Sequence, residues 1–289
     1  MQTSLFRSLL SLHLAVMLFG AAGVIGKYIA VGALSLVFGR TLFAAVSLAP
    51  LVNWRCVKAT KNLASTLGNG ALLALHWLSF FASLQYAAVA FGLMGFATYP
   101  IFVALLEPWI FRLPRHRRET WMAVMVVFGL LVMLSDAHWQ DGSVMAVGMG
   151  IISGLSFALL TLNTRDQSKS LSATQVAFIQ NSVACFLLLP LILYHGELCS
   201  VSIKTWFLLA LLGSVFTALS HSLFAYSLQR LPATLASLTA SLEPVYGIGL
   251  AYIFLDEVVS FRAICGAAIV LLATSFATYA HRSTENESS

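Results

Sequence analysis

Apolar stretches recur along the whole chain and are separated by short polar connections. Each stretch is close to the ~20 residues that a helix needs to cross the hydrocarbon core of a bilayer. We therefore predict an all-α integral membrane protein with ten transmembrane helices. The predicted helices are Leu9–Ala30, Leu34–Val52, Asn69–Ala88, Phe91–Phe111, Trp121–Ser135, Ser143–Leu162, Ala173–Tyr194, Thr205–Leu228, Pro232–Leu255 and Phe261–Ala280.

The composition supports a membrane protein and argues against a soluble one. Of the 289 residues, 59% are hydrophobic and 9% are charged, and the mean hydropathy is +0.88. A soluble domain carries about 25% charged residues, so this chain has too little polar surface to face water on all sides. The four cysteines lack metal or redox spacing, and no Walker, HExxH or catalytic-triad pattern occurs. We expect no ATP hydrolysis, no metal and no cofactor, and we do not expect an enzyme.

Basic residues gather in the connections that follow the second, fourth, sixth and eighth predicted helices, and near both termini. Basic residues mark cytoplasmic loops, so both termini are predicted to be cytoplasmic in a multi-pass protein of the plasma (inner) membrane. The net charge of +5 then reflects topology, and no nucleic-acid partner is expected. The residues on this side are Arg7, Arg55, Lys58, Lys61, Arg112, Arg115, Arg117, Arg118, Arg165, Lys169, Arg230 and Arg282.

The two halves of the chain carry a similar motif at an offset of 144 residues. Phe80–Pro100 reads FFASLQYAAVAFGLMGFATYP, and Phe224–Pro244 reads FAYSLQRLPATLASLTASLEP. In both, Ser-Leu-Gln precedes a helix with a mid-span proline, which is expected to kink it. We predict two repeats, residues 1–140 and 141–289. Because each has five helices, the second is inverted, an architecture typical of secondary transporters with a site near the midplane.

Several motifs are similar to those of the EamA family of the drug/metabolite transporter superfamily. They are FGAAGVIGK from Phe19 to Lys27, Tyr99-Pro100, and SLEPVYGIGLAYIFLDE from Ser241 to Glu257, with Arg40 opening the second helix. The resemblance covers roughly 9–135 and 143–280. Phe19 replaces the usual Trp, the first repeat ends in EPWIFRLPR, and Asp256 stands where Gly is usual. The family implies a ten-helix secondary carrier of small organic metabolites, often an exporter, with amino-acid exporters among its members.

Two histidines fall inside predicted spans, where ionisable groups are rare and usually face a cavity. His76, beside Trp77, and His221 lie one position apart in the repeat register. Either imidazole could donate a hydrogen bond to a substrate carboxylate or carry a proton; alternatively, each binds a backbone carbonyl and serves packing. With Phe80, Tyr99 and Tyr226, they are the predicted substrate-binding residues, lining an aromatic-walled cavity.

Two acidic residues are the remaining candidates within the spans. Glu243 precedes Pro244 near mid-span, where an unpaired charge costs about 2.5–3.5 kcal/mol on insertion scales. It is a candidate for proton coupling, with a structural bond to the carbonyl freed by Pro244 as the alternative. For Glu107 there are two alternatives: it forms an inner gate, or it forms an interfacial ion pair with a basic residue of the arginine-rich loop. Pro100 and Pro244 are the predicted hinges.

These features predict a secondary transporter, and an exporter in particular, that works by alternating access, with proton coupling as a candidate energy source. Its partners would be a small-molecule substrate, with amino acids favoured by the resemblance, and the lipid bilayer, as a monomer or homodimer. The alternatives are a membrane-embedded enzyme, a structural subunit of a membrane complex, or a channel. An enzyme would need clustered catalytic groups, and a channel a ring of like groups. Lys27 and Arg40 are expected to pair with loop acids or to extend to the outer headgroups.

Overall fold

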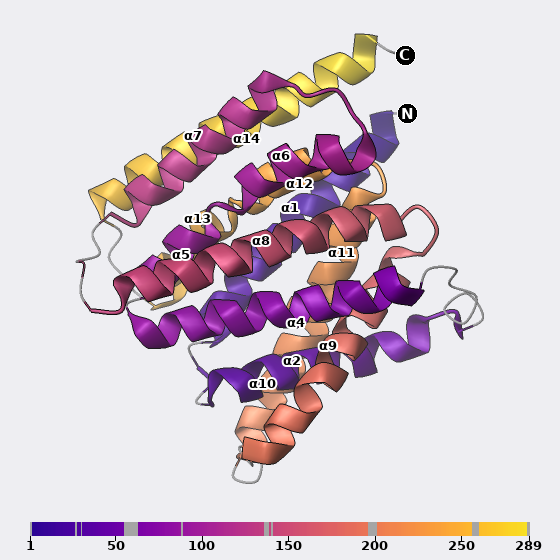
Figure 1. The fold of residues 1–289 in the computed structure, drawn as a ribbon, viewed down its shortest axis with the longest axis vertical. Coiled ribbons are helices and arrows are strands. Elements are labelled where there is room, and N and C mark those ends of the chain that lie inside the picture. Colours follow the sequence, from indigo (N-terminus) through magenta and orange to yellow (C-terminus); the bar gives the residue numbers. More distant parts are fainter. Residues whose placement is uncertain are drawn as a thin grey trace.

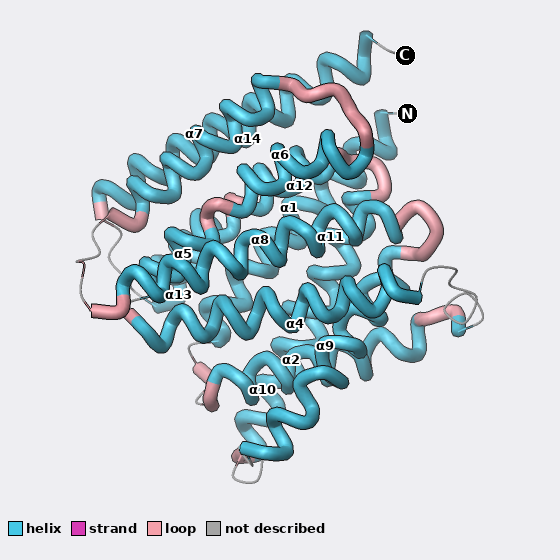
Figure 2. Tube along the Cα trace, viewed as in Figure 1, coloured by secondary structure: helices cyan, strands magenta, loops and turns pink. Residues whose placement is uncertain are grey.

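Within the part of the chain that the computed structural model describes, every regular element is a helix (Figure 2). The described residues are 2–26, 28–29, 31–54, 63–87, 89–135, 139, 141–195, 201–255 and 260–287. Lys27, several basic loop residues, Asp256 and Glu257 lie outside them. The elements are α1 (Gln2–Gly26), α2 (Ala33–Leu48), the 3₁₀ turn η1 (Ala49–Leu51), α4 (Leu63–Tyr86), α5 (Val89–Phe96), α6 (Tyr99–Phe111), α7 (Arg117–Met133), α8 (Ser143–Gln167), α9 (Ala173–His195), α10 (Ile203–Gly213), the π-helical η3 (Ser214–Leu219), α11 (Ser220–Leu228), α12 (Ala233–Ala240), α13 (Glu243–Leu255) and α14 (Phe261–Glu287).

Seven helical stretches in the described ranges are long and apolar enough to cross a membrane. They are Leu5–Gly26, Ala33–Leu51, Phe91–Phe111, Ser143–Gln167, Ala173–Tyr194, Ile203–Leu228 and Phe261–His281. The chain is therefore a multi-pass membrane protein. Three predicted spans, Asn69–Ala88, Trp121–Ser135 and Pro232–Leu255, are not among the seven. Helices occupy these regions too, but α7 has only 17 residues, and the third region is divided into α12 and α13.

Two of the predicted spans are broken rather than kinked. A turn at residues 97–98 separates α5 from α6, and another at residues 241–242 separates α12 from α13. Pro100 and Pro244 are therefore the second residues of new helices, not kinks inside continuous ones. Proline fits there because the first N–H groups of a helix have no intrahelical partner. Each break lies directly before Tyr99 or Glu243, the first residue of the helix that follows.

Some helices extend beyond the apolar stretches that predicted them. α4 begins six residues earlier than the predicted Asn69, at Leu63, and α8 continues past Leu162 to Gln167. The added turns bind each other: Gln167 Nε2 donates to the Ser65 carbonyl oxygen over 3.0 Å. Gln167 is buried, and hydropathy alone placed the start of α4 too late and the end of α8 too early.

The helices form one bundle in which the two halves of the sequence interleave (Figure 1). α7 and α14 pack together along one edge, and α2 packs against α9 and α10 towards the other. Between them, α4 and α5 pack on α8, while α1 contacts α11 and α13. The broken helices meet where α6 contacts α12. The start of α1 and the end of α14 lie at the same end of the bundle in Figure 1.

Glycines allow the closest helix approaches. A Cβ on Gly95 of α5 would lie 2.2 Å from the carbonyl oxygen of Val147, and one on Gly150 of α8 would lie 2.3 Å from that of Gly92. Gly20 of α1 faces the first turn of α13 in the same way, 2.8 Å from the carbonyl oxygen of Glu243. Small residues thus let backbones meet without a hydrophobic driving force, as is typical of helices in lipid.

Candidate functional site

The centre of the bundle holds His76 and Trp77 of α4 against rings from other helices. The His76 ring centre lies 4.8 Å from that of Phe157 on α8 and 5.3 Å from that of Phe96 on α5. Phe96 in turn stacks on Tyr99 at 5.3 Å. The predicted aromatic grouping around His76, Trp77 and Tyr99 is therefore present, with Phe96 and Phe157 as further members.

Ser153 of α8 is the hydrogen-bond partner of one ring nitrogen of His76. Nδ1 lies 2.8 Å from Ser153 Oγ and 3.2 Å from the Ser153 carbonyl oxygen. Because a carbonyl oxygen can only accept, the second contact favours the tautomer with the hydrogen on Nδ1, in which Nε2 is an acceptor. The packing role predicted for His76 therefore occupies Nδ1, and Nε2 remains for a substrate.

Arg40 lies at this centre and not at the outer headgroups. Its guanidinium carbon is 4.1 Å from the centre of the Trp77 ring, and Nε donates to Thr217 Oγ1 over 3.1 Å. The expected pairing with loop acids or extension to the headgroups is wrong. Arg40 is the eighth residue of α2, too far inside for its side chain to leave the bundle, and Trp77 offers the cation an aromatic face instead.

Thr217 reaches Arg40 because the helix widens at this point. It belongs to the π-helical η3, and its hydroxyl donates to the Leu212 carbonyl, five residues earlier, over 2.9 Å. π-helical turns inside α-helices occur frequently at functional sites. The wider turn lets one hydroxyl satisfy a backbone carbonyl and accept a hydrogen bond from Arg40.

His221 of α11 continues the cluster beyond Trp77. Their ring centres are 5.6 Å apart, and Phe19 of α1 meets His221 edge-on at 5.8 Å. Asn181 Nδ2 donates to the Ala177 carbonyl over 2.8 Å and lies 3.2 Å from His221 Nδ1. The carbonyl contact fixes the amide nitrogen as the donor, so His221 Nδ1 accepts and Nε2 carries the hydrogen. The two histidines thus present opposite hydrogen-bonding groups.

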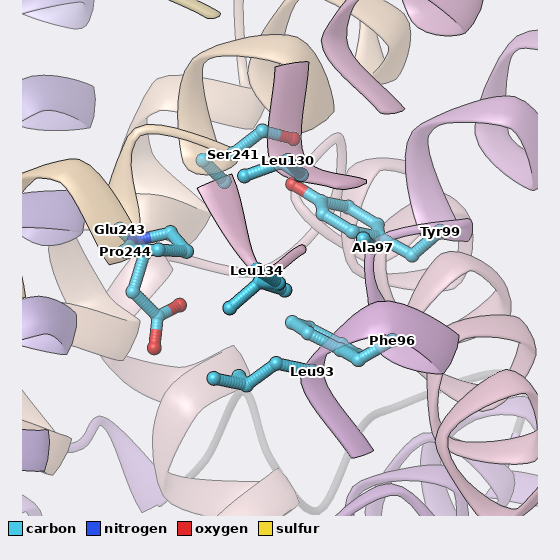
Figure 3. Close-up of a pocket in the computed structure, with 10 residues that line it drawn as sticks. Leu93, Phe96, Ala97, Tyr99, Leu130, Leu134, Ser241, Glu243 and Pro244 are labelled. Carbon is cyan, nitrogen blue, oxygen red and sulfur yellow. The ribbon is translucent and has the colours of Figure 1, made fainter. Parts of the chain in front are cut away.

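Tyr99 and Glu243 lie at the two helix breaks and line one small cavity with Pro244 and Phe96 (Figure 3). The Tyr99 hydroxyl donates to the Ser237 carbonyl and so ties α6 to α12. The Glu243 carboxyl points away from the Tyr99 ring in this view, and it makes no hydrogen bond within the described residues. The structural alternative for Glu243, a bond to a freed carbonyl, is therefore not formed here.

A second cavity lies beside His221 and is lined by Phe19, Phe157, Phe224, Leu160, Thr164 and Gln180. Each cavity encloses about 20 Å³, room for about one water molecule. Phe96 of the first cavity and Phe157 of the second have ring centres 5.7 Å apart. A metabolite can enter only when these rings and their helices move apart.

The charged and titratable side chains of the centre form one electrostatic group. The guanidinium carbon of Arg40 lies 4.1 Å from the centre of the Trp77 ring, and that ring centre is 6.3 Å from the ring centre of His76 and 5.6 Å from that of His221. Arg40 is close enough to Glu243 for their charges to interact, although no hydrogen bond joins them. They come from four different helices: α2, α4, α11 and α13. One fixed cation, one acid and two imidazoles therefore share a site walled by aromatic rings.

Glu107 lies at the end of α6, away from this centre, and is 3% exposed. Its carboxylate accepts hydrogen bonds from the guanidinium of Arg165 in the last turn of α8 and from the hydroxyl of Thr234. The backbone N–H groups of Ala233 and Thr234 also donate to it, each over 2.6 Å. Glu107 thus caps the N-terminus of α12, where a negative charge is favoured. The expected partner of Glu107 was a basic residue of the arginine-rich loop after α6. The observed partner is Arg165 of α8.

The remaining predicted residues lie in different places. Phe80 packs against His76 and Phe96, with ring centres 6.4 and 5.8 Å away. Tyr226 is not brought to the centre; it packs against the cluster of Leu171, Val176 and Ile179 around the start of α9. Pro100 lies one residue from Tyr99, and Pro244 lines the first cavity beside Glu243. The binding role of Tyr226 stays a prediction.

The sequence interpretation missed Arg40, Thr217 and Arg165 as site residues. An arginine within an apolar span is itself a signal of function, and this signal was available for Arg40. Thr217 became visible only with the π-helical turn. Among the described residues no group of three or more His, Cys, Asp or Glu side chains could hold a metal ion.

Comparison with known proteins places the chain among transporters. An "Uncharacterized transporter" of Archaeoglobus fulgidus is 27% identical over 240 residues, covering 82% of this chain and 84% of the relative. The "Uncharacterized transporter YwfM" of Bacillus subtilis is 26% identical over 203 residues, an alignment that covers 69% of this chain and 68% of the relative. A chain of known structure, titled only "Crystal structure of protein", superposes with a TM-score of 0.80 at 14% identity, covering 98% of this chain and 99% of that one. That last likeness concerns the fold alone.

The model of the EamA-like transporter family matches residues 6–135 and 144–279. The match takes in both halves of the chain and every helix that contributes a side chain to the central group. The protein is thus a membrane transporter, and the chain belongs to the EamA-like transporter family.

Proposed function

We propose that the protein is a secondary transporter that exports small organic metabolites, amino acids or related compounds, by alternating access. The observation that carries this proposal is the central group of Arg40, His76, His221 and Glu243, enclosed by aromatic rings. These groups come from helices of both halves of the chain. Ionisable side chains in apolar helices mark substrate and ion pathways, and carriers place such sites between their repeats.

The helix contacts support two inverted five-helix repeats, residues 1–140 and 141–289. Contacts occur in corresponding pairs when the two halves are exchanged: α4 packs on α8 as α11 packs on α1, and α6 packs on α8 as α13 packs on α1. Glycine contacts follow the same exchange. A Cβ on Gly70 would meet Gln180 and Val183 of α9, and one on Gly213 would meet Arg40 and Phe43 of α2. The two stretches matched by the family model have nearly the same bounds as these halves.

The proposed orientation places both termini in the cytoplasm and the protein in the inner membrane. The start of α1 and the end of α14 lie at one end of the bundle in Figure 1, as an even number of spans requires. The end of α8 lies at this end as well, with Arg165 in its last turn and Lys169 two residues beyond it. Basic residues at one end of the helices support a cytoplasmic face there.

In this proposal Glu107 is the inner gate. Its carboxylate joins α6, α8 and α12 at the cytoplasmic end through Arg165, Ala233 and Thr234. Opening towards the cytoplasm requires these bonds to break, with the breaks before Pro100 and Pro244 acting as hinges. The broken helices meet through α6 and α12, so both halves would move together.

Glu243 is the proposed proton-coupling residue because its carboxylate has no hydrogen bond in the described chain and lines a cavity at a helix break. An acid that binds a proton in one conformation and releases it in another links transport to the proton gradient. Glu243→Gln is expected to retain exchange of substrate but to lose its pH dependence. Unchanged rate and pH dependence would contradict this role.

The experiment that tests the proposed function is counterflow in proteoliposomes. Vesicles with the purified protein are loaded with a mixture of unlabelled amino acids and placed in the same mixture at low, radiolabelled concentration. Transient accumulation of label, saturable and absent from empty liposomes, supports a carrier. Label that equilibrates without overshoot indicates a channel, and chemical conversion without movement indicates an enzyme; either result would contradict the proposal.

A further inference from the structure

A seam of buried polar side chains runs along α8, on the side that faces α4 and α9. At the proposed cytoplasmic end of α8, Gln167 Nε2 donates to the Ser65 carbonyl oxygen over 3.0 Å. Asn69 Nδ2 donates to Gln167 Oε1 over 3.1 Å and lies 3.3 Å from Thr164 Oγ1. Gln180 Nε2 of α9 donates to the same hydroxyl oxygen of Thr164 over 2.6 Å. Hydrogen bonds therefore continue without a gap from the end of α8 to Gln180.

The seam ends at the cavity beside His221. Thr164 and Gln180 line this cavity together with His221, and its other lining residues are apolar. The cavity encloses about 20 Å³, room for about one water molecule, and a buried water needs about two to four polar partners. Thr164, Gln180 and His221 can supply them. The cavity at the end of the seam therefore suits a water molecule.

Three polar atoms beside the seam have no hydrogen-bond partner among the residues that the structure describes. They are Asn69 Oδ1, Thr161 Oγ1 and Asn181 Oδ1, and all three side chains are completely buried. Thr161 lies three residues before Thr164 and so on the same face of α8, and Asn181 is the residue that binds His221. A buried polar atom without a partner is unfavourable, and in native proteins an ordered water commonly satisfies it.

The corresponding positions in the other half of the chain carry no polar side chain. Leu209 there is completely buried in an apolar cluster with Ala22 and Leu212. In an inverted repeat these positions lie towards the opposite face of the membrane, so the contact is polar on the proposed cytoplasmic side and apolar on the outer side. Packing of these helices therefore does not by itself call for polar side chains. At the offset of 144 residues, the pairs are Ser65 and Leu209, Asn69 and Gly213, Thr164 and Gly20, Gln167 and Gly23, and Gln180 and Leu36.

We propose that the seam is a narrow water-filled passage that connects the cytoplasm with the cavity beside His221. Polar side chains within apolar helices usually face a water-filled space and mark a pathway. The inner gate at Glu107 faces α6 and α12, whereas the seam faces α4 and α9, so water and solute pass on different sides of α8. Hydrogen-bonded water also conducts protons, so the passage would let the central group exchange protons with the cytoplasm while solutes are excluded. This consequence rests on the proposed function, whereas the passage itself does not.

The test follows water directly in the detergent-solubilised full chain. An X-ray pulse splits bound water into hydroxyl radicals, which oxidise adjacent side chains, and mass spectrometry locates the products. Leu160 and Phe224 line the cavity and are expected to be oxidised, whereas Leu12, completely buried in an apolar cluster, is not. After rapid mixing with water enriched in a heavy oxygen isotope, the products are expected to carry that isotope, because the passage is open to bulk solvent.

Variants of Thr164 test the centre of the seam. Thr164→Val removes the hydroxyl at nearly constant shape, and because apolar cavities of this size stay dry, oxidation of Leu160 and Phe224 is expected to fall about tenfold. Thr164→Ser keeps the hydroxyl and should keep the oxidation. Thr274→Val is the matched control and should also keep it, because the buried Thr274 hydroxyl bonds only carbonyls of its own helix, α14.

Two further variants test the length of the passage. Asn69→Leu combined with Thr164→Val and Gln180→Leu replaces the polar cluster by apolar groups together, which leaves few buried partners unpaired. This variant should reduce oxidation of Leu160 to the level of Leu12. Gln167→Leu changes only the cytoplasmic mouth, so the extent of oxidation should persist while exchange of the oxygen isotope slows severalfold. Folding of each variant is judged by its elution as a single species in size-exclusion chromatography.

Each result either supports the passage or overturns it. Oxidation of Leu160 no greater than that of Leu12, or unchanged in folded Thr164→Val and in the folded triple variant, would overturn it. Oxidation without isotope exchange would indicate a trapped water, and an unchanged exchange rate in Gln167→Leu would indicate another route; both contradict the inference. No solute takes part in these measurements. If counterflow fails while water in the cavity exchanges as expected, the passage stands and the transporter proposal fails.

Discussion

Glu107 and Arg165 form an ion pair that connects the last turns of α6 and α8, and the same carboxylate caps α12. The side chain of Glu107 is 4% exposed and that of Arg165 is 22% exposed. Removing one partner of a buried pair typically costs about 3–5 kcal/mol, because the other charge is left without compensation. The carboxylate of Glu107 therefore joins three helices at one end of the molecule.

Glu107→Gln is expected to open that end. Both carboxylate oxygens of Glu107 accept hydrogen bonds, whereas a glutamine side chain has one acceptor oxygen and one NH₂ group. The NH₂ group would face either a backbone N–H group or the guanidinium of Arg165, so at least one hydrogen bond is replaced by a repulsion between donors. In a cysteine-free background, a cysteine at Leu160 in the second cavity reports access to the site. We expect faster labelling by a membrane-impermeant maleimide, and only from the face on which Glu107 lies.

The neighbouring pair of Asp166 and Lys169 supplies the control for this experiment. Their side chains are 59% and 60% exposed, with 2.9 Å between the charged atoms. Exposed pairs contribute about 0–1 kcal/mol, so Asp166→Asn should leave the labelling rate unchanged. Equal labelling in Glu107→Gln and Asp166→Asn would show that the carboxylate of Glu107 does not close this end.

Gly266→Ala is expected to destabilise the contact between α7 and α14. A Cβ at this position would lie 2.4 Å from the Gly129 carbonyl oxygen and 2.6 Å from Met133 Cβ, so the helices must separate. Overpacking of this kind typically costs about 1–3 kcal/mol. We expect a lower unfolding temperature, measured as the loss of the monodisperse peak after heating in detergent.

Gly148→Ala is the matched control, since a Cβ there meets nothing within 4 Å. Alanine is favoured over glycine inside a helix by about 0.8–1.0 kcal/mol, so this variant should be as stable as the parent or more so. A similar loss in both variants would mean that the separation of α7 and α14 is not the cause.

Thr217→Val is expected to leave the Arg40 guanidinium less firmly positioned, whereas Thr217→Ser is expected to keep it in place. Valine has the shape of threonine but loses both the bond to the Leu212 carbonyl and the bond from Arg40 Nε. An unsatisfied buried acceptor costs about 1–3 kcal/mol, so the unfolding temperature should fall. Counterflow in proteoliposomes should fall too, and both should return with serine. Full activity in Thr217→Val would contradict a positioning role.

The sequence predicted the helical class, the multi-pass membrane protein and the family, because apolar length and composition are local properties of the chain. It placed Tyr99 and Glu243 correctly at a change of backbone, since proline marks such a change. It did not predict that the helices end before Pro100 and Pro244. Whether proline kinks or starts a helix depends on the helices packed against it.

Side-chain partners were predicted less well, because they depend on helices distant in the sequence. Arg40 was expected to leave the bundle, yet its partners are Trp77 and Thr217, and no spacing along the chain connects them. The same holds for Glu107, whose partners lie on α8 and α12. Tyr226, which matched the aromatic pattern, faces the start of α9, because helix rotation decides which ring turns inward.

The two nitrogens of His76 allow its packing role to be separated from its binding role. Nδ1 meets Ser153, whereas Nε2 is the atom left for a substrate. The amide nitrogen of asparagine can occupy the place of Nδ1, and the amide of glutamine can reach the place of Nε2. We expect His76→Asn to keep the unfolding temperature but weaken affinity about 3- to 10-fold, the worth of one hydrogen bond of about 0.5–1.5 kcal/mol. His76→Gln should do the reverse, with lower stability and nearly normal affinity. His76→Ala should lose more affinity than folded yield. If the asparagine variant bound substrate normally and the glutamine variant did not, His76 would serve the site only through Ser153.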